Sequence, residues 1–464
     1  MHWSEASLFY HIYPLGFCGA PPENDGETEP EERIKAVYDW IGSMEELGVT
    51  ALYLGPLFES ATHGYDTIDY RTVDRRLGTN GDLSELIAAL QGRGIRVVLD
   101  AVLNHVSRRF FAFQDVLEHG DVSRYWDWFA GISLGVNSPL GDPFSYETWD
   151  GHYELVKLNH ENPEVREYLL GVVEGWITEF GIDGLRLDAA DVISEEFLRD
   201  LRERCGSLNS EFWLLGEMVH GDYNRLANSR TLHSVTNYEC YKGLYSSHND
   251  GNYFEIAHSL KRQFQDPGIY RDFLPYNFAD NHDVDRVATS LDARSDLYPL
   301  HILLCTMPGI PSIYYGSEWG IEGGRGAESD DALRPPAAEL LRRPERDDTL
   351  YALISRLARI RRDHRSLQDG RYRELLVEHR QLAFLMDNGH ERMLVAVNSS
   401  DEEVALEIPL DRGKAGIRAG ESPREGDVYR DILNDTGDRR ASEGVIRCTL
   451  LPKWGVILRS RESD

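Results

Sequence analysis

The sequence lacks several features, and each absence excludes a class of protein. Its 464 residues contain no apolar run of about 18 residues, so we expect no membrane-spanning helix. Only five cysteines are present, an odd number without paired spacing, which argues against a disulfide framework and against a cysteine-based zinc site. We therefore expect reduced, mostly buried thiols at Cys18, Cys205, Cys240, Cys305 and Cys448.

Basic residues are also scarce. Lysine and arginine together number 49, against 79 aspartates and glutamates, and the formal net charge is −30. This balance argues against a nucleic-acid partner, because a phosphate backbone requires basic side chains to neutralise it. The acidity itself has two explanations that the sequence leaves open: an ordinary soluble acidic surface, or adaptation to high salt.

The N-terminal stretch MHWSEASLFYHIYPLGF has neither the basic start nor the small-residue cleavage site of a signal peptide. It leads directly into a strand-like segment. We therefore expect a cytoplasmic protein with no membrane partner. The sequence does not indicate an oligomeric state.

Short apolar segments alternate with amphipathic ones through the first three-quarters of the chain. The amphipathic stretch at 162–181, for example, has proline near its start and glycine at its end, as helices do. Strand and helix alternating about eight times over roughly 360 residues is typical of a (β/α)8 TIM barrel. The expected strands lie within residues 7–15, 50–57, 95–103, 182–190, 212–218, 234–239, 273–280 and 310–316.

Two regions depart from this alternation. More than fifty residues rich in aromatic residues, glycine and aspartate separate His105 from the helix expected near Pro163. An excursion of this length inside a compact domain is usually a functional insertion. After about residue 370 the apolar pattern has a period of two, which predicts a C-terminal antiparallel β-sandwich. We therefore expect a barrel over 1–105 and 163–370, an insertion after strand three over 106–162, and a sandwich over 371–464.

Charged residues lie at the ends of the expected barrel strands. In GLRLDAADV (184–192), Arg186 and Asp188 close an apolar run, and side chains two apart on a strand point to the same face. Arg186 is therefore expected to orient Asp188 and keep it ionised. Glu217 ends the next strand, and Asp283 follows the seventh. Because barrel active sites lie at the C-terminal ends of the strands, these carboxylates are expected to meet.

Two carboxylates at one centre are what glycosidic cleavage requires. One protonates the leaving oxygen, while the other attacks the anomeric carbon or guides water to it. Taken singly, an Arg-x-Asp pair is more often a structural ion pair, and a strand-terminal glutamate is more often solvated. Their order on successive strands is what favours a catalytic site.

The motifs DAVLNH, GLRLDAADV, GEMVHGD and FADNHD, in this order, resemble the four signature regions of the α-amylase family of glycoside hydrolases, family 13. HGYDTIDY (63–70) and PGIPSIYYGSEWG (308–320) are similar to two further family segments. The resemblance implies Asp188 as nucleophile, Glu217 as general acid/base and Asp283 as the carboxylate that stabilises the transition state. It also implies a substrate-binding set formed by Tyr65, Asp66, His105, Arg186, His282, Asp330 and Arg334.

Two further segments, LVKLNHENPEVREYL (155–169) and FFAFQDVLEHG, resemble neopullulanase and cyclomaltodextrinase relatives. Because the first barrel strand is expected from residue 7, we do not expect the N-terminal β-domain that is usual in that branch. The implied function is retaining hydrolysis of α-1,4-glucosidic bonds in maltooligosaccharides, starch-type α-glucans or cyclodextrins through a covalent glycosyl-enzyme. An α-glucosidase and a transglycosylating maltogenic enzyme stay open as alternatives. A non-catalytic glucan-binding relative is a remote one, because all three carboxylates are present.

No cofactor is required by this interpretation, and calcium is left open. Asn104 resembles a position that binds calcium in many α-amylases, but its partners in the insertion cannot be assigned from the sequence. The aromatic residues of the insertion are expected mainly to pack, and whether one of them forms a sugar-stacking wall is left open. They are Trp126, Trp128, Phe129, Tyr146 and Trp149.

Overall fold

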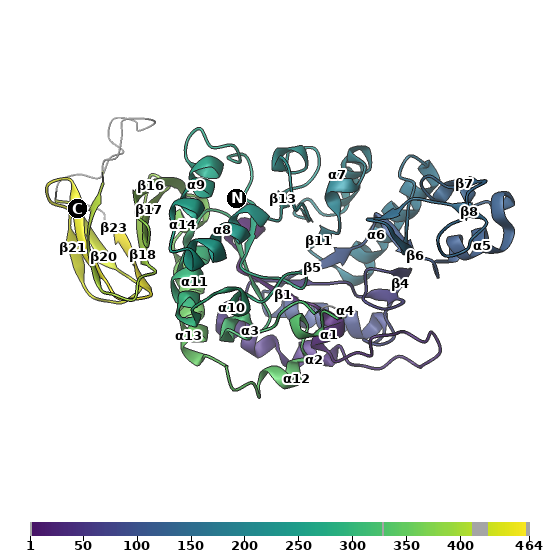
Figure 1. The fold of residues 1–464 in the computed structure, drawn as a ribbon, viewed down its shortest axis with the longest axis horizontal. Coiled ribbons are helices and arrows are strands. Elements are labelled where there is room, and N and C mark those ends of the chain that lie inside the picture. The colour runs from purple at the N-terminus through teal and green to yellow at the C-terminus, as the bar shows by residue number, and fades with distance from the viewer. Residues whose placement is uncertain (1, 327–328, 411–425, 461–464) are drawn as a thin grey trace.

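The computed structural model describes residues 2–326, 329–410 and 426–460. Eight parallel strands form one sheet in the spatial order β13-β12-β11-β5-β2-β1-β15-β14. A parallel bridge between Thr236 and Tyr276 joins the two ends of this sheet, so the strands close into the predicted (β/α)8 barrel (Figure 1). The strands span Phe9–Ile12 (β1), Ala51–Leu54 (β2), Arg96–Ala101 (β5), Gly184–Leu187 (β11), Trp213–Gly216 (β12), Ser234–Val235 (β13), Tyr276–Phe278 (β14) and Ile310–Tyr314 (β15).

All eight expected barrel strands are present, and each is shorter than the apolar segment that predicts it. The fourth, expected within 182–190, ends at Leu187. Two residues later Ala189 has φ 45°, a left-handed conformation that a strand does not contain. The apolar character continues past the strand because the loops at this end of the barrel are buried as well.

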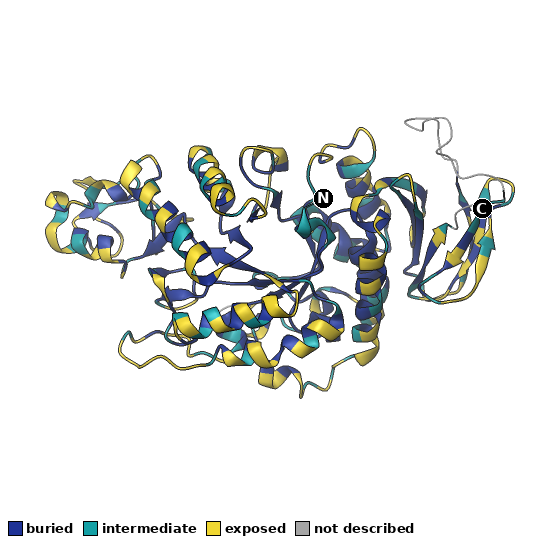
Figure 2. Cartoon of the chain, turned by 180° about the vertical axis from the view of Figure 1, so that it is seen from behind, coloured by how far each residue is buried: buried dark blue, intermediate teal, exposed yellow. Residues whose placement is uncertain are grey.

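Helices cover the outside of the barrel, with buried faces toward the strands and exposed faces toward solvent (Figure 2). α4 (Asn80–Gly92) begins with a capping box: the Thr79 side chain accepts the backbone N–H of Asp82, and the Asp82 carboxylate accepts that of Thr79. The other helices are α1 (Pro14–Phe17), α2 (Lys35–Asp39), α3 (Ile41–Leu47), α6 (Pro163–Phe180), α7 (Glu195–Leu208), α8 (Tyr238–Asn249), α9 (Phe254–Phe264), α10 (Val287–Ser290), α11 (Leu297–Thr306), α12 (Ala337–Leu340), α13 (Asp348–Asp363) and α14 (Ser366–Asp369).

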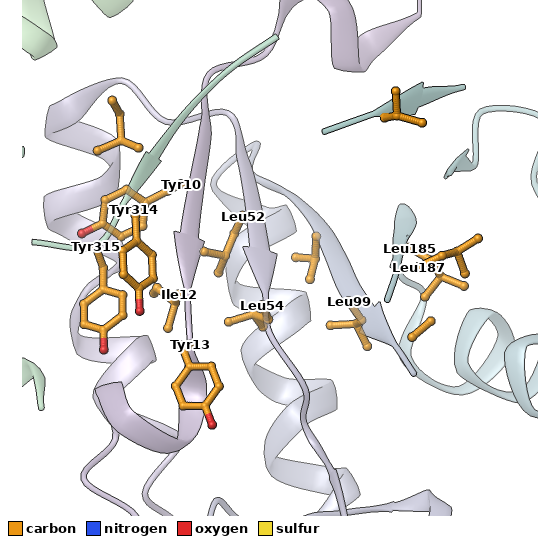
Figure 3. Packing of buried hydrophobic residues seen from close by; sticks show 14 of the residues in the cluster. Tyr10, Ile12, Tyr13, Leu52, Leu54, Leu99, Leu185, Leu187, Tyr314 and Tyr315 are labelled. Carbon is orange, nitrogen blue, oxygen red and sulfur yellow. The ribbon is translucent and has the colours of Figure 1, made fainter. Parts of the chain in front are cut away.

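Side chains of the barrel strands alternate between the helices and the barrel interior. One set packs with the helices in a large buried cluster, shown in Figure 3; it includes Tyr10, Ile12, Leu52, Leu54, Leu99, Leu185 and Leu187. The alternate positions form a separate interior cluster that includes Phe9, Tyr53, Val98, Trp213 and Leu215. Continuing the interior set toward the C-terminal strand ends leads from Val98 to Asp100, and in the neighbouring strand to Arg186. The alternation therefore aims these charged groups into the barrel mouth.

The chain between β5 and α6 forms the insertion, at the opposite end of the molecule from the C-terminal sheets (Figure 1). An antiparallel sheet in the order β6-β10-β9, a two-stranded ribbon and one helix make it up. Phe113, Phe129 and Tyr146 are buried there with ring contacts of 5.0–5.1 Å, so the insertion has a packed interior. Its elements are β6 (His105–Ser107), α5 (Phe111–His119), β7 (Ser133–Leu134), β8 (Phe144–Ser145), β9 (Thr148–Trp149) and β10 (His152–Lys157).

Two antiparallel sheets follow α14, and their facing sides share a buried apolar cluster that includes Leu385, Leu394, Leu406, Ile446 and Leu458. The predicted β-sandwich is therefore present, and it packs on α9 and α11. Its strands are β16 (Arg371–Val377), β17 (Gln381–Asp387), β18 (Arg392–Asn398), β19 (Val404–Pro409), β20 (Val428–Asp431), β21 (Asp438–Arg440), β22 (Val445–Leu450) and β23 (Trp454–Ser460).

Two expectations from composition concern the whole chain. The five cysteines are free thiols, and four of them are buried. Within the described ranges, no helix combines the length and the apolar character needed to cross a bilayer.

Candidate active site

The predicted acids lie at the C-terminal ends of neighbouring barrel strands. Asp188 follows β11, and its backbone N–H donates to the carbonyl of Ala101 at the end of β5 at 3.1 Å. Glu217 follows β12, and its backbone N–H donates to the carbonyl of Leu187 at 2.9 Å. The parallel ladder thus continues to the two acids themselves and holds their backbones at adjacent positions.

One buried guanidinium connects the acids. Nη1 of Arg186 lies 2.9 Å from Oδ1 of Asp188 and 3.0 Å from Oδ1 of Asp100, and Nη2 lies 2.9 Å from Oε1 of Glu217. The Arg186 side chain is only 4% exposed. Charge-assisted contacts of this kind are short and strong, and the planar fork allows one arginine to orient two carboxylates at once.

The residue after Asp188 supplies a second restraint on Glu217. Ala189 has φ 45°, an uncommon conformation for a residue with a Cβ atom. Its backbone N–H donates to Oε2 of Glu217 at 3.0 Å. Both oxygens of Glu217 are therefore held, one by Arg186 and the other by the strained turn that follows Asp188.

The Asp188 carboxyl is buried beside two other acids. Burial raises its pKa well above the usual value, Arg186 opposes this rise, and the charges of Glu217 and Asp100 add to it. The sequence predicts that Arg186 favours the charged form of Asp188 in particular. In the structure Arg186 contacts Asp188, Glu217 and Asp100 alike. Protonation is therefore a property of the coupled group of carboxylates.

Asp283 lies in a different electrostatic environment. Its Oδ2 is 3.0 Å from Nε2 of His282, and its Oδ1 is 3.4 Å from Nη2 of Arg334. Loss of water acts to raise the pKa of Asp283, but His282 and Arg334 outweigh it and hold that pKa well below its usual value. Arg334 also lies 3.6 Å from Asp330. Of this predicted Asp–Arg pair, Arg334 is therefore the member that contacts Asp283.

Tyr65 joins the two sides of the site. Its ring stacks on His282 with centroids 5.4 Å apart and an interplanar angle of 9°. Its hydroxyl donates to Oδ2 of Asp100 at 3.0 Å and contacts Nε2 of His282. A tyrosine held in this way offers a fixed aromatic face beside the acids, as a sugar-stacking residue requires.

The structure places Asp66 differently from the other predicted residues. Its carboxylate accepts the backbone N–H of Thr62 at 3.1 Å and the Thr62 hydroxyl at 2.7 Å. This closes the loop between β3 (Phe58–Ser60) and β4 (Thr67–Val73) that carries Tyr65. Asp66 therefore acts on the site through the position of Tyr65. The loop also requires Gly64, which has φ +91° and where a Cβ atom would lie 2.7 Å from Pro56.

His105 approaches Asp188 from the start of the insertion. Its Nε2 lies 3.9 Å from Oδ2 of Asp188, too far for a hydrogen bond, and has no hydrogen-bond partner among the described residues. Burial lowers the pKa of His105 to about 4, so the ring is neutral near pH 7. The ring of Trp149 lies 5.8 Å from that of His105, and Trp149 is 36% exposed. Of the insertion's aromatic residues considered from sequence, Trp149 stands beside the predicted site.

Asp100 is the main residue of this site that the sequence analysis did not select. Its side chain is fully buried, and it accepts hydrogen bonds from Tyr53 at 2.6 Å, Tyr65 at 3.0 Å and Arg186 at 3.0 Å. It lies inside the expected strand at 95–103, where a single acid does not interrupt the apolar pattern. The sequence does contain a signal for this residue. Asp100 is two residues from Val98, whose side chain points into the barrel, so the side chain of Asp100 points inward as well.

Asn104, the position that the resemblance connects with calcium, lies buried beside His105. Its Oδ1 is buried without a hydrogen-bond partner, but its Nδ2 lies 3.2 Å from Nδ1 of His105. Calcium takes six to eight oxygen ligands, usually including carboxylates. Over residues 2–326, 329–410 and 426–460, no three side chains of the His, Cys, Asp and Glu types group in a way that could hold a metal ion.

The arrangement suits acid–base chemistry at an acetal. The buried Asp188 and the partly buried Glu217, both held by one guanidinium, can act as nucleophile and proton donor, and the ionised Asp283 can stabilise a developing positive charge. Tyr65 offers an aromatic face beside Asp100, and Trp149 offers one beside His105. These are the requirements for cleaving a bond between two sugars.

The whole chain resembles known proteins with this chemistry. The family model described as alpha amylase, catalytic domain, matches residues 11–349. Neopullulanase 2 of Thermoactinomyces vulgaris is 32% identical over 486 residues, which cover 98% of this chain and 78% of that protein. The intracellular maltogenic amylase of Bacillus subtilis is 29% identical over 384 residues, which cover 79% of this chain and 63% of that protein.

Solved structures agree with the sequence relatives. A structure of cyclomaltodextrinase superposes with a TM-score of 0.81 at 28% identity, covering 99% of this chain and 78% of that one. Residues 11–349, which the family model matches, include the insertion and every strand end that carries a predicted acid. The chain belongs to the α-amylase family of glycoside hydrolases.

Proposed function

We propose that this chain is a retaining hydrolase of α-1,4-glucosidic bonds that acts on maltooligosaccharides and cyclodextrins through a covalent glycosyl-enzyme. The observation that carries the proposal is the bridge formed by Arg186, which holds Asp188 and Glu217 at its two terminal nitrogens, 2.9 Å from each. A shared cation keeps the two acids close together. Retention requires such closeness, with carboxyl groups about 5–5.5 Å apart.

In the first step Glu217 carries a proton and Asp188 is ionised. Glu217 transfers its proton to the glycosidic oxygen as the bond between that oxygen and the anomeric carbon breaks. The Asp188 carboxylate attacks the same carbon and forms a glycosyl ester, while the leaving sugar departs as a neutral alcohol. Asp283, ionised beside His282 and Arg334, stabilises the positive charge that develops on the sugar ring.

In the second step a water molecule replaces the departed sugar. Glu217, now a carboxylate, takes a proton from the water as its oxygen attacks the anomeric carbon. The ester bond to Asp188 breaks, and its carboxylate returns to the contact with Arg186. Two inversions at one carbon leave the product in the α configuration.

The substrate class follows from the relatives and from the wall of the site. Proteins named cyclomaltodextrinase and neopullulanase are similar over 98–99% of this chain. Trp149 adds an exposed aromatic face next to His105, where a glucose unit bound near Asp188 would meet it. These features favour compact glucans that enter the site whole. The B. subtilis relative is named intracellular, which supports a cytoplasmic location for this chain as well.

Transfer to a second sugar is the other activity that the site favours. The glycosyl ester on Asp188 accepts any hydroxyl that Glu217 can deprotonate, and the aromatic face of Trp149 would hold an acceptor sugar close by. One of the relatives is a maltogenic amylase. We therefore expect transfer products to accompany hydrolysis at high concentrations of maltotriose.

Product analysis tests the proposal. The enzyme is incubated with maltoheptaose, β-cyclodextrin, pullulan and soluble starch, and the products are separated by chromatography. We expect β-cyclodextrin and maltoheptaose to be cleaved to short maltooligosaccharides faster than starch. The Asp188→Asn variant provides the background. Preferred cleavage of starch, or no cleavage of any α-1,4-linked substrate, would contradict the proposal.

A further inference from the structure

A cavity of about 450 Å³ lies at the end of the barrel opposite the acids. Trp213 and Ile310, the first residues of β12 and β15, line it, and so does His233, which directly precedes β13. The first residues of parallel strands share one end of a barrel, so this cavity is separate from Asp188 and Glu217. Its other walls come from α7, the N-terminal segment and residues 224–232.

Arg202 of α7 faces this cavity without an acidic partner. Its Nη1 donates to the carbonyl of Thr231 at 3.0 Å, and no carboxylate of the described ranges lies within 4.0 Å of its guanidinium. Burial lowers the pKa of Arg202, the effect expected when no anion compensates for lost water. The other two arginines of α7 are both paired: Arg199 with Glu195 at 3.1 Å, and Arg204 with Glu174 at 3.1 Å.

His233 presents a second donor to the same cavity. Its Nδ1 accepts the backbone N–H of Leu214 at 2.9 Å, so the neutral ring carries its proton on Nε2. No group in the described part of the chain accepts a hydrogen bond from Nε2 of His233. Burial, together with the charges of Arg202 and His2, lowers the pKa of His233 to about 3. An anion placed between Arg202 and His233 would accept hydrogen bonds from both groups and so replace the water that each loses on burial.

A second cavity of about 450 Å³ lies next to the first, and Asn224, Asn228 and Ser229 line both. Arg225 and Arg230 line this second cavity, and neither has an ion-pair partner within the ranges that the structure describes. We call the two neighbouring cavities together the Arg202 groove. The acids along it are Glu195, which is paired with Arg199, the half-buried Glu5 and the exposed Asp272.

The rest of the groove is suited to a compact ring. Leu232, Leu274 and Ile310 form an apolar side, and Phe273 is partly exposed beside them. The amide N–H groups of Asn224 and Asn228 already donate to neighbouring groups of the chain, so Oδ1 of Asn224 and the Ser229 hydroxyl are the polar groups of the shared lining that can bind sugar hydroxyls. The volume falls within the range of about 300–1,000 Å³ that is typical of small-molecule sites.

We propose that the Arg202 groove binds a sugar phosphate, with the phosphate between Arg202 and His233 and the sugar ring against the apolar side. Arginine suits this task because its planar group binds two phosphate oxygens at once. In a chain with 79 acidic and 49 basic residues, general surface charge does not attract anions, so binding depends on this local site. The proposal is independent of the reaction at Asp188 and Glu217.

Calorimetric titration of the full chain with glucose 6-phosphate tests the proposal. We expect saturable binding that weakens at least tenfold in Arg202→Gln, and several-fold in Arg230→Gln, which alters an exposed side chain and preserves the fold. The matched control is Arg204→Gln, on the same helix but facing Glu167 and Glu174, which should bind like the wild type. All three variants should hydrolyse maltotriose at the wild-type rate.

Two further titrations separate the sources of binding. Inorganic phosphate should bind more weakly than glucose 6-phosphate, because it lacks the ring. Glucose, which lacks the phosphate, should displace neither of these two ligands. The proposal is overturned if glucose 6-phosphate does not bind at millimolar concentration, or if Arg202→Gln and Arg204→Gln weaken binding equally. It is also overturned if glucose or phosphate alone binds as tightly as glucose 6-phosphate.

Discussion

Nη2 of Arg186 lies 2.9 Å from Oε1 of Glu217, although the two residues are on different strands. The alternation rule predicts contact of Arg186 with Asp188, two residues away on the same chain segment. Contact with Glu217 arises because β11 and β12 pair in register, with Leu187 opposite Gly216. The proposed nucleophile and the proposed proton donor therefore both contact one cation.

Replacing Asp188 by asparagine removes the attacking carboxylate. We expect turnover of maltotriose to fall at least about a thousandfold, because no glycosyl ester can form. The amide occupies the same volume and can still bond to its neighbours, so the circular dichroism spectrum should be unchanged. A folded variant that keeps a tenth of the wild-type rate would show that another residue is the nucleophile.

The configuration of the first product reports the distance between the acids. With Asp188 and Glu217 held by one guanidinium, hydrolysis should proceed by double displacement and release the α anomer. Proton NMR during the first minutes of maltotriose cleavage measures this directly, before mutarotation mixes the anomers. If the β anomer accumulates first, water attacks directly and Asp188 is not a nucleophile.

The role of Glu217 as proton donor can be separated from its structural contacts by the choice of substrate. Glu217→Gln keeps one acceptor oxygen for Arg186 or Ala189, loses the other of these two contacts and cannot protonate a leaving oxygen. Fluoride needs little protonation, so formation of the glycosyl-enzyme from α-glucosyl fluoride should be far less impaired than cleavage of maltotriose. Pre-steady-state rates compare the two substrates, and equal losses on both would exclude Glu217 as the acid.

Trp149 is predicted to bind sugar through its ring. Trp149→Ala should raise the KM for maltotriose about fivefold, which corresponds to losing about 1 kcal/mol of aromatic contact. The kcat should change little, because Trp149 touches none of the three acids. Trp149→Phe retains an aromatic face and serves as the matched control. An unchanged KM in the alanine variant would assign Trp149 to packing alone.

Glu318 links stability to pH. It is buried after β15, where the Tyr10 hydroxyl donates to Oε1 at 2.6 Å while Oε2 has no hydrogen-bond partner within the described structure. Burial raises the pKa of Glu318 to about 7 in the folded state, from about 4.5 when unfolded. Folding therefore favours the protonated form, and the contribution to stability is full below about pH 4.5 and is lost as the pH rises through 7.

The loss amounts to at most about 3 kcal/mol, because each pKa unit corresponds to about 1.4 kcal/mol. Urea unfolding at pH 5 and pH 7.5 should show a smaller difference between the two pH values in Glu318→Gln than in the wild type. The exposed Glu339 provides the control, since Glu339→Gln should keep the wild-type difference. Equal pH dependence in both variants would mean that Glu318 is ionised without cost.

Much of the fold and of the site was predictable because it depends on local patterns. Each barrel strand is a short apolar run between amphipathic segments, and the rule that active sites lie at strand ends then selects Asp188, Glu217 and Asp283. The sequence pattern did not reveal Asp100 as a site residue, because an acid inside an apolar run looks like part of a buried strand. Its spacing of two residues from Val98 nevertheless places both side chains on the same face of the strand. Asp66 was grouped with the substrate-binding residues, and only its contact with Thr62 reveals that it closes the Tyr65 loop.

By itself, the sequence determined the order of strands and helices and singled out Asp188, Glu217 and Asp283 as candidate acids, since these follow from residue type and spacing along one segment. Only the tertiary structure decided that Arg186 holds three carboxylates, that Trp149 reaches His105 and that Arg202 lies beside a cavity with no acidic partner among the residues described. The physical reason is that contacts between segments depend on strand register, loop path and helix orientation. Those are set by the packing of the whole chain, which no local pattern contains.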